Sequence, residues 1–220
     1  MQPRYFTTDY VERTTLRDGT PVVLRLVVPE DKEILRRGFD RWSYESRYAR
    51  FLVPKQRLTD DELRYLTEVD QETHFALGAL SETGDGHGEP VGLGIARFIR
   101  LPEQPGEPVT AEAAIAVSDE VHGKGLGRLL FLRLVAAAAE RGIERFRCEV
   151  LGSNSTMKTL IDRIAPEHQT EVEAGVMRID FPVPATQPDV PPAEVPANAM
   201  YDLFRAVAEG ALQIVRRLRE

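Results

Sequence analysis

Glycines at alternate positions, Gly123, Gly125 and Gly127, separate a strand-like stretch from a long apolar stretch of helical composition. Glycine lets a backbone turn tightly and leaves it uncovered by a side chain. The helix that follows begins with unpaired N–H groups and a partial positive charge. This order of elements predicts an α/β fold in which the loop and helix N-terminus hold a phosphate or diphosphate. A purely structural turn that caps the helix is the alternative.

The spacing of the loop excludes two common nucleotide-binding patterns. A Walker loop requires glycine where Ser118 stands, and serine or threonine where Gly125 follows Lys124. The dinucleotide pattern, begun at Gly123, requires glycine at the position of Arg128. The loop therefore belongs to neither class.

Short strand patterns alternate with amphipathic helices along most of the chain. Strands are expected at residues 22–27, 74–80, 91–101, 109–117 and 145–151, with one or two more in 171–181. Helices are expected from Pro29, over 44–51, after the capping box of Thr59 and Glu62, over 125–141, and after Ser153 or Asn154. Interspersed strands and helices predict an α/β domain with a mixed central sheet of six to seven strands flanked by helices.

Composition shifts divide the chain into four segments. Residues 1–14 are expected to form an N-terminal arm, and residues 15–181 the folded domain. Residues 182–197 are rich in proline and predict an extended linker. Residues 198–220 predict an amphipathic C-terminal extension helix, whose apolar face covers its own domain or forms a homodimer contact.

The overall composition is that of a soluble globular protein. Hydrophobic residues make up 42% and charged residues 29%, and no apolar run reaches the length of a membrane span. A single cysteine, Cys148, and the lack of a signal-peptide core at the N-terminus favour a cytoplasmic protein without membrane attachment. The net charge of −7 disfavours nucleic acid as a partner, and the four histidines show no metal-ligand spacing.

The glycine loop resembles the R/Q-x-x-G-x-G/A signature of the GNAT superfamily of N-acetyltransferases, with His122 in place of arginine or glutamine. Residues 18–25, 111–117 and 149–157 resemble further segments of that family in matching order. Residues 43–51 resemble a segment of the bacterial protein-lysine acetyltransferases. The resemblance spans about residues 15–181 and implies the GNAT fold, with a mostly antiparallel mixed sheet.

The resemblance also implies acetyl-CoA as the co-substrate and no metal. Ile115 and Val117 would contact the pantetheine arm, and a backbone N–H near Val117 would face the thioester oxygen. The cofactor-binding residues that it implies are Ile115, Val117, His122, Gly123, Lys124, Gly125, Leu126, Gly127, Arg128 and Asn154. Lys124 and Arg128 are equally compatible with surface cations, and Asn154 with a plain helix N-cap.

Glu112 occupies the acidic position of the strand before the loop and is the implied general base. A solvated strand residue or a structural salt bridge is the alternative. The tyrosine that many relatives use as an acid is absent from Lys158–Ile161. The resemblance implies acetyl transfer to a primary amine, favouring a protein lysine, by direct attack in a ternary complex. A small-molecule amine acetyltransferase and a non-catalytic acyl-CoA sensor remain open.

Overall fold

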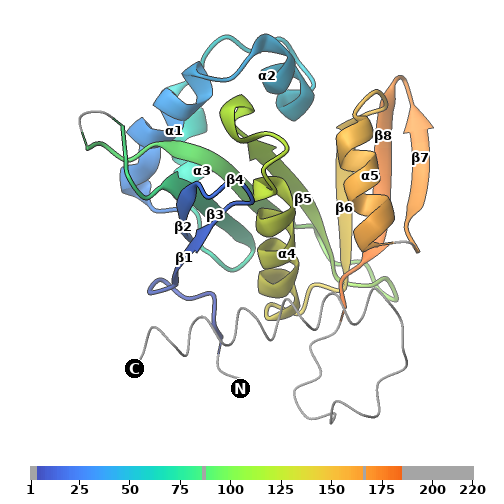
Figure 1. The fold of residues 1–220 in the computed structure, drawn as a ribbon. Helices are drawn as coiled ribbons and strands as arrows, with labels where there is room; N and C mark the ends of the chain where they lie inside the picture. Colours follow the sequence, from blue (N-terminus) through green and yellow to red (C-terminus); the bar gives the residue numbers. More distant parts are fainter. Residues whose placement is uncertain (1–3, 86–87, 166, 185–220) are drawn as a thin grey trace. The chain divides into compact units, whose positions relative to one another are not determined.

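A computed structural model describes residues 4–85, 88–165 and 167–184 of the 220-residue chain (Figure 1). The described strands are β1 (Val11–Thr15), β2 (Pro21–Leu26), β3 (His74–Ser81), β4 (Gly92–Arg100), β5 (Thr110–Val117), β6 (Arg145–Leu151), β7 (Gln169–Glu173) and β8 (Val176–Pro182). The helices are α1 (Lys32–Asp40), α2 (Tyr44–Phe51), α3 (Asp60–Thr67), α4 (Leu126–Ala139) and α5 (Ser155–Ile164), with 3-10 turns η1 (Pro29–Asp31) and η2 (Asp119–Val121). The strands hydrogen-bond in the order β1-β2-β3-β4-β5-β6-β8-β7.

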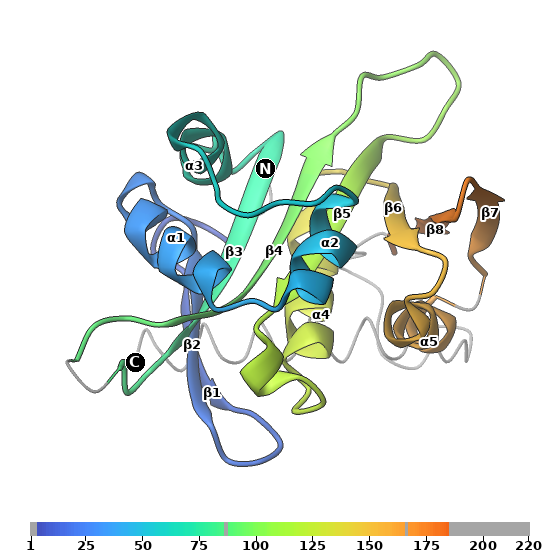
Figure 2. The same ribbon diagram turned by 90° about the horizontal axis from the view of Figure 1, so that it is seen from above.

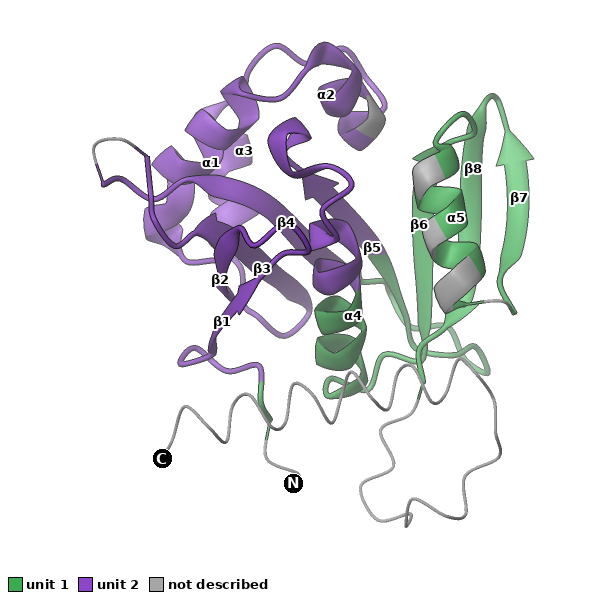
Figure 3. Ribbon diagram, in the orientation of Figure 1, with its two compact units in different colours: residues 1–5, 100–112, 132–220 green, residues 6–99, 113–131 purple. Residues whose placement is uncertain are grey.

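Two compact units divide this arrangement (Figure 3). Unit 1 contains residues 1–5, 100–112 and 132–220, and unit 2 contains residues 6–99 and 113–131. Strand β5 and helix α4 each contribute to both units.

Unit 2 is built on the antiparallel strands β1 to β4. Helices α1 and α3 lie on one side of β3 and β4, and the first turns of α4 lie on the other (Figure 2). The rings of Phe75 on β3 and Phe98 on β4 stack with centroids 5.3 Å apart, and both side chains are fully buried. A second apolar cluster joins Phe39 of α1 to Leu63 and Leu66 of α3. Burial of these side chains fixes the helices on the sheet.

Unit 1 contains the start of β5 and the strands that follow α4. Thr110, Ala111 and Glu112 pair in parallel with Arg145, Phe146 and Arg147 of β6. Strand β8 runs antiparallel to β6, and β7 forms the edge beyond it. Helix α5 lies over one face of β6 and β8 in both views (Figures 1 and 2). The rings of Phe146 and Phe181 meet edge to face, with centroids 5.8 Å apart, inside this unit.

The expected α/β fold with a mixed, mostly antiparallel sheet is confirmed, but the described residues form eight strands where six to seven were expected. The additional strand is β1, within the segment expected to be an arm. Its alternation is concealed because Glu12 occupies a buried position and accepts a 2.5 Å hydrogen bond from the Tyr10 hydroxyl. The expected extension helix, residues 198–220, lies outside the described residues, as does all but the start of the expected linker. Among the described helices, none is long and apolar enough to cross a membrane.

Glycine at position 94 allows α4 to approach β4 closely. A Cβ at Gly94 would lie 2.9 Å from Leu130 Cδ1, 3.3 Å from Leu126 Cδ2 and 3.1 Å from the carbonyl oxygen of Ala116. Real Cβ atoms essentially never approach heavy atoms under 3.0 Å, so Leu130 would have to shift, and the carbonyl of Ala116 is a backbone group that gives way less easily than a side chain. The first turns of α4 can therefore pack this closely on β4 only because residue 94 has no side chain.

We expect Gly94→Ala to lower the free energy of unfolding by about 1 to 3 kcal/mol, because the added methyl group overpacks the α4–β4 contact. Gly38→Ala is the matched control. Its Cβ would meet only the Gly92 carbonyl oxygen at 3.7 Å, in the interior of α1. Alanine there should stabilise by roughly 0.5 to 1 kcal/mol through helix propensity. Urea denaturation of both variants measures the difference, and equal effects of the same sign would contradict it.

Candidate functional site

The glycine loop places unpaired N–H groups at the start of α4. Gly123 and Gly125 have φ angles of +73° and +96°, which side-chain-bearing residues rarely adopt, and α4 begins immediately afterwards at Leu126. Within the described part of the chain, the backbone N–H groups of Gly123, Gly125, Leu126, Gly127 and Arg128 donate to no protein acceptor. The positive end of the α4 dipole adds to these donors. Together they form a site suited to an anion such as a diphosphate.

The turn between β1 and β2 braces this loop. The Arg17 N–H donates to the Lys124 carbonyl oxygen at 3.1 Å, and Lys124 Nζ lies 2.9 Å from Asp18 Oδ2. The hydrogen bond from Lys124 lowers the pKa of Asp18 to about 2, with further help from Thr20. Lys124, an expected cofactor-binding cation, is therefore paired with Asp18.

His122 connects the loop to the end of β5. Its Nε2 atom lies 3.0 Å from the Val117 carbonyl oxygen and 3.7 Å from Asp119 Oδ1. Because a carbonyl oxygen only accepts, Nε2 carries the proton in this contact. The histidine at the first signature position thus holds the loop to the strand through the backbone of Val117.

Asp119 fastens the start of α2 to the turn that precedes the loop. Its Oδ2 accepts from the Ser43 N–H at 2.7 Å, and its Oδ1 accepts from the Ser46 hydroxyl. Burial acts to raise the pKa of Asp119, but the hydrogen bonds from Ser46 and Ser43 outweigh it and hold this pKa below its usual value. Sequence reasoning missed this carboxylate because its partners lie more than 70 residues earlier.

The end of β5 carries the residues that are expected to contact the thioester and the pantetheine arm. The Ser118 N–H donates to the Leu93 carbonyl oxygen at 2.8 Å, so this donor is committed to the backbone of β4. Val117 and Ile115 lie on the half of β5 that belongs to unit 2, and both are partly exposed. Their contact with pantetheine stays a prediction.

Glu112 lies in unit 1 with an exposed side chain. Its register partner on β6 is Arg147, but that guanidinium binds Asp180 through Nε at 2.9 Å and Nη2 at 3.3 Å. Among the residues that the structure describes, Glu112 has neither a hydrogen-bond partner nor an ion pair. The salt-bridge alternative thus receives no support there, and the carboxylate is accessible to a proton donor.

Asn154 forms the N-cap of α5. Its Oδ1 accepts from the Met157 N–H at 3.0 Å, which is the helix-capping geometry considered as the alternative. The cap fixes the side-chain oxygen, and a contact of this residue with the cofactor stays a prediction.

Cys148 is buried on β6. Burial, with smaller contributions from Asp180 and Glu112, raises the pKa of its thiol to about 12. The thiolate is the nucleophilic form of cysteine, so Cys148 is inert at neutral pH.

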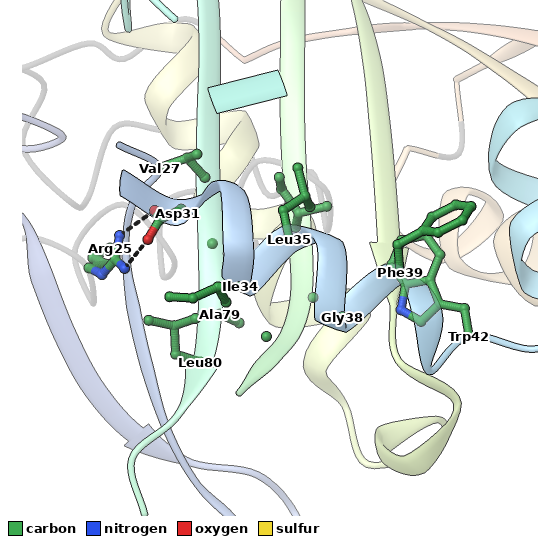
Figure 4. A pocket seen from close by; sticks show the side chains of 14 residues that line it. Arg25, Val27, Asp31, Ile34, Leu35, Gly38, Phe39, Trp42, Ala79 and Leu80 are labelled. Carbon is green, nitrogen blue, oxygen red and sulfur yellow. Dashed lines mark hydrogen bonds and ion pairs between the residues drawn. The ribbon is translucent and has the colours of Figure 1, made fainter. Parts of the chain in front are cut away.

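A pocket of unit 2 lies between α1 and the strands β3 and β4 (Figure 4). It holds about 520 Å³ of space, open solvent at its mouth included. The Arg25–Asp31 ion pair stands at one end of α1, and Phe39 with Trp42 at the other. Arg25 Nη1 lies 2.7 Å from Asp31 Oδ2, and Nη2 binds Oδ1 in the same fork. The charged groups of the lining are thus committed to each other, and the remaining wall is apolar.

His74 opens β3 and contacts a buried arginine. Arg97, only 3% exposed, places Nη1 3.3 Å from His74 Nε2 and donates from Nη2 to the Leu66 carbonyl oxygen at 2.8 Å. Burial and then the charge of Arg97 lower the pKa of His74 to about 4. Burial and then Arg50 lower the pKa of Arg97 to about 9, so the guanidinium stays charged at neutral pH. These contacts fit a structural role for His74.

We expect the stability of the protein to fall as the pH drops from 6.5 toward 4. In that window the unfolded chain protonates His74, whose ordinary pKa is 6.5, while the fold keeps it neutral. Allowing for its partial exposure, the contribution is about 1 to 2 kcal/mol. His74→Gln keeps an acceptor for Arg97 but does not titrate, so its unfolding free energy should depend less on pH. Equal pH slopes for both proteins in urea denaturation would contradict this assignment.

We expect Asp119→Asn to release the start of α2. The two oxygens of Asp119 accept hydrogen bonds from Ser43 and Ser46, and the amide nitrogen of asparagine cannot accept either of them. The loss should be about 1 to 2 kcal/mol of stability. Hydrogen exchange should become faster at the amides of residues 43–47 and remain unchanged in β7 and β8. Asp61→Asn, an exposed acid on α3 paired with Arg64, is the matched control. Unchanged exchange at residues 43–47 would show that Asp119 does not hold α2.

Comparisons with known proteins agree with this fold and loop. The model of the acetyltransferase (GNAT) family matches residues 39–162. Acetyltransferase Pat of Mycolicibacterium smegmatis is 31% identical over 206 residues, which cover 93% of this chain and 56% of that protein. The GNAT domain of S. lividans PAT has a TM-score of 0.68 at 28% identity, covering 83% of this chain and 99% of that one.

A cAMP-binding acyltransferase from Mycobacterium smegmatis has a TM-score of 0.52 at 27% identity, covering 96% of this chain and 56% of that one. The chain thus spans about half the length of the Pat relative and of this acyltransferase. The family model nevertheless covers more than half of the chain, and it includes the glycine loop and the strand before it. The chain belongs to the GNAT family of acetyltransferases, as its glycine loop and flanking segments predict.

Proposed function

We propose that the protein transfers an acetyl group from acetyl-CoA to a primary amine, by direct attack in a ternary complex. The observation that carries this proposal is the set of unpaired N–H groups at Gly123 and Gly125–Arg128, at the positive end of α4. These groups suit the diphosphate of coenzyme A, and they lie in the segment that resembles the GNAT signature.

The other cofactor contacts follow from the same placement. Ile115 and Val117 would bind the pantetheine arm along β5, and Arg128 would add charge beside the diphosphate. His122 supports the strand end through the Val117 carbonyl oxygen, which keeps that backbone in place as the cofactor binds. Asn154 would contribute its amide group from the start of α5.

Glu112 is the proposed general base. A lysine amine has a pKa near 10.4 and is almost wholly protonated at neutral pH. Glu112, directly or through a water, would accept the proton so that the neutral nitrogen attacks the thioester carbonyl carbon. A carbon–nitrogen bond forms, the carbon–sulfur bond breaks, the nitrogen gives up its second proton to water, and coenzyme A departs as a thiolate. Lys158–Ile161 supplies no tyrosine to protonate this thiolate, which would leave unaided or take a proton from water.

A protein lysine is the favoured acceptor. Residues 43–51 resemble the protein-lysine acetyltransferases, and two of the similar proteins are named Pat. This segment forms α2, where Tyr44 is 60% exposed and stacks on Tyr48 with ring centroids 6.3 Å apart. Exposed aromatic side chains of this kind are common in surfaces that bind other proteins.

Thiol release from acetyl-CoA tests the activity. The purified protein is mixed with acetyl-CoA and, in separate reactions, with a lysine-containing protein, a polyamine or an amino acid. Release that depends on the lysine-containing protein, with acetyl-lysine found by mass spectrometry, is the expected result. Release with small amines alone would assign the acceptor to that class. Binding of acetyl-CoA without release for any acceptor would indicate a sensor.

We expect Glu112→Gln to lower kcat about 100-fold or more, because the amide cannot accept the proton. The Kd for acetyl-CoA, measured by calorimetry, should stay within about twofold, since the proposed role begins after cofactor binding. Glu30→Gln, an exposed acid in η1, is the control and should leave both quantities unchanged. An unchanged kcat for Glu112→Gln would remove this residue from the mechanism.

A further inference from the structure

The side chain of Arg17 lies against the glycine loop. A Cβ built on Gly125 would lie 3.4 Å from Arg17 Nε, 3.6 Å from Cδ and 3.6 Å from Cγ. The same construction at Gly123 meets nothing within 4 Å. These are ordinary van der Waals distances, so the Arg17 side chain packs directly over Gly125, where the φ angle of +96° favours glycine. The β1–β2 turn thus places a guanidinium beside the N–H donors of the loop.

The backbone of the turn is fixed to the loop independently of this side chain. The Arg17 N–H bonds to the Lys124 carbonyl oxygen, and Asp18 binds the Lys124 ammonium. The backbone position of Arg17 is therefore set by two contacts that do not involve its guanidinium. A cation on this support is pre-positioned, which lowers the entropy lost when it binds an anion.

Arg17 differs from the neighbouring cations in how its charge is paired. Arg13 on the same hairpin lies 3.2 Å from Glu82, Arg25 pairs with Asp31, and Lys124 pairs with Asp18. In the part of the chain that the structure describes, Arg17 has no carboxylate partner, and it is exposed. A cation at this loop without an acidic partner is available to a bound anion.

We propose that Arg17 is a cofactor-binding residue that contacts the diphosphate of coenzyme A from the β1–β2 turn. The inference rests on the proposed function, because it takes the loop as the diphosphate site. The planar guanidinium matches the geometry of phosphate oxygens and pairs with them through two N–H groups. The loop N–H groups bind the diphosphate from the α4 side, and Arg17 adds a full charge from the other element.

An acidic protein that binds an anionic ligand needs positive charge close to the binding site. The protein carries a net charge of −7, and its ligand is itself an anion. Lys124 shares its charge with Asp18, which stands at the same turn. Arg17 offsets the acidic surroundings at the loop, where Arg128 is the further exposed cation at the start of α4.

The test is calorimetry with coenzyme A and with 3′-dephospho-coenzyme A, on the full chain. Arg17→Gln keeps the carbon stem that packs on Gly125 and removes the charge. We expect its Kd for both ligands to rise about three- to tenfold at low salt, with a smaller rise at high salt. Arg17→Lys should recover part of the affinity. Arg13→Ala, on the same hairpin, should stay within about twofold, and thermal melting confirms that each variant is folded.

The other outcomes overturn the proposal in distinguishable ways. Unchanged affinity of Arg17→Gln, with tight binding by the unmodified protein, would refute the Arg17 contact and leave the proposed function intact. A loss confined to coenzyme A, with 3′-dephospho-coenzyme A unaffected, would refute the diphosphate assignment in favour of the 3′-phosphate. The absence of binding by the unmodified protein to either ligand would refute the proposed function itself.

Discussion

The unpaired N–H groups at the start of α4 are the feature that the conformation and the contacts of the glycine loop maintain. A helix always begins with donors that its own turns cannot satisfy. Here two left-handed glycines lead into the helix without covering those donors, and Gly94 lets α4 rest closely on β4. The N–H groups therefore keep a fixed position relative to β4, because a movement of α4 would break the packing of Leu130 against that strand.

Two separate segments hold this loop from its flanks. The β1–β2 turn bonds to Lys124, and the turn η2 is bonded through Asp119 to the start of α2. His122 adds a contact to the end of β5. A glycine-rich loop is flexible by itself, so these contacts limit the conformational entropy that ligand binding would otherwise remove. Helix α2 and the turn before the loop are therefore linked through one carboxylate.

Local sequence patterns predicted most of the fold. Alternation indicated β6, which buries one face, and the Thr59–Glu62 capping box indicated α3. The short apolar run of residues 74–80 indicated β3, which is buried on both faces. Such patterns failed at β1, where the buried Glu12 interrupts the apolar pattern. Residue types and the family resemblance predicted Glu112 and the glycine loop as site residues, and these roles stay predictions. The contacts of Asp119 and Arg17 could not be predicted, because their partners are brought close by the fold and lie far away in the sequence.

The burial of Cys148 has a practical consequence for enzymology. It is the single cysteine of the chain, and its burial on β6 raises the pKa of its thiol to about 12. Disulfide-exchange chromogens react with thiolates, and this side chain supplies almost none at neutral pH. Any colour developed in such an assay would thus come from other released thiols, with negligible background from the folded protein. The same shielding protects this cysteine from oxidation.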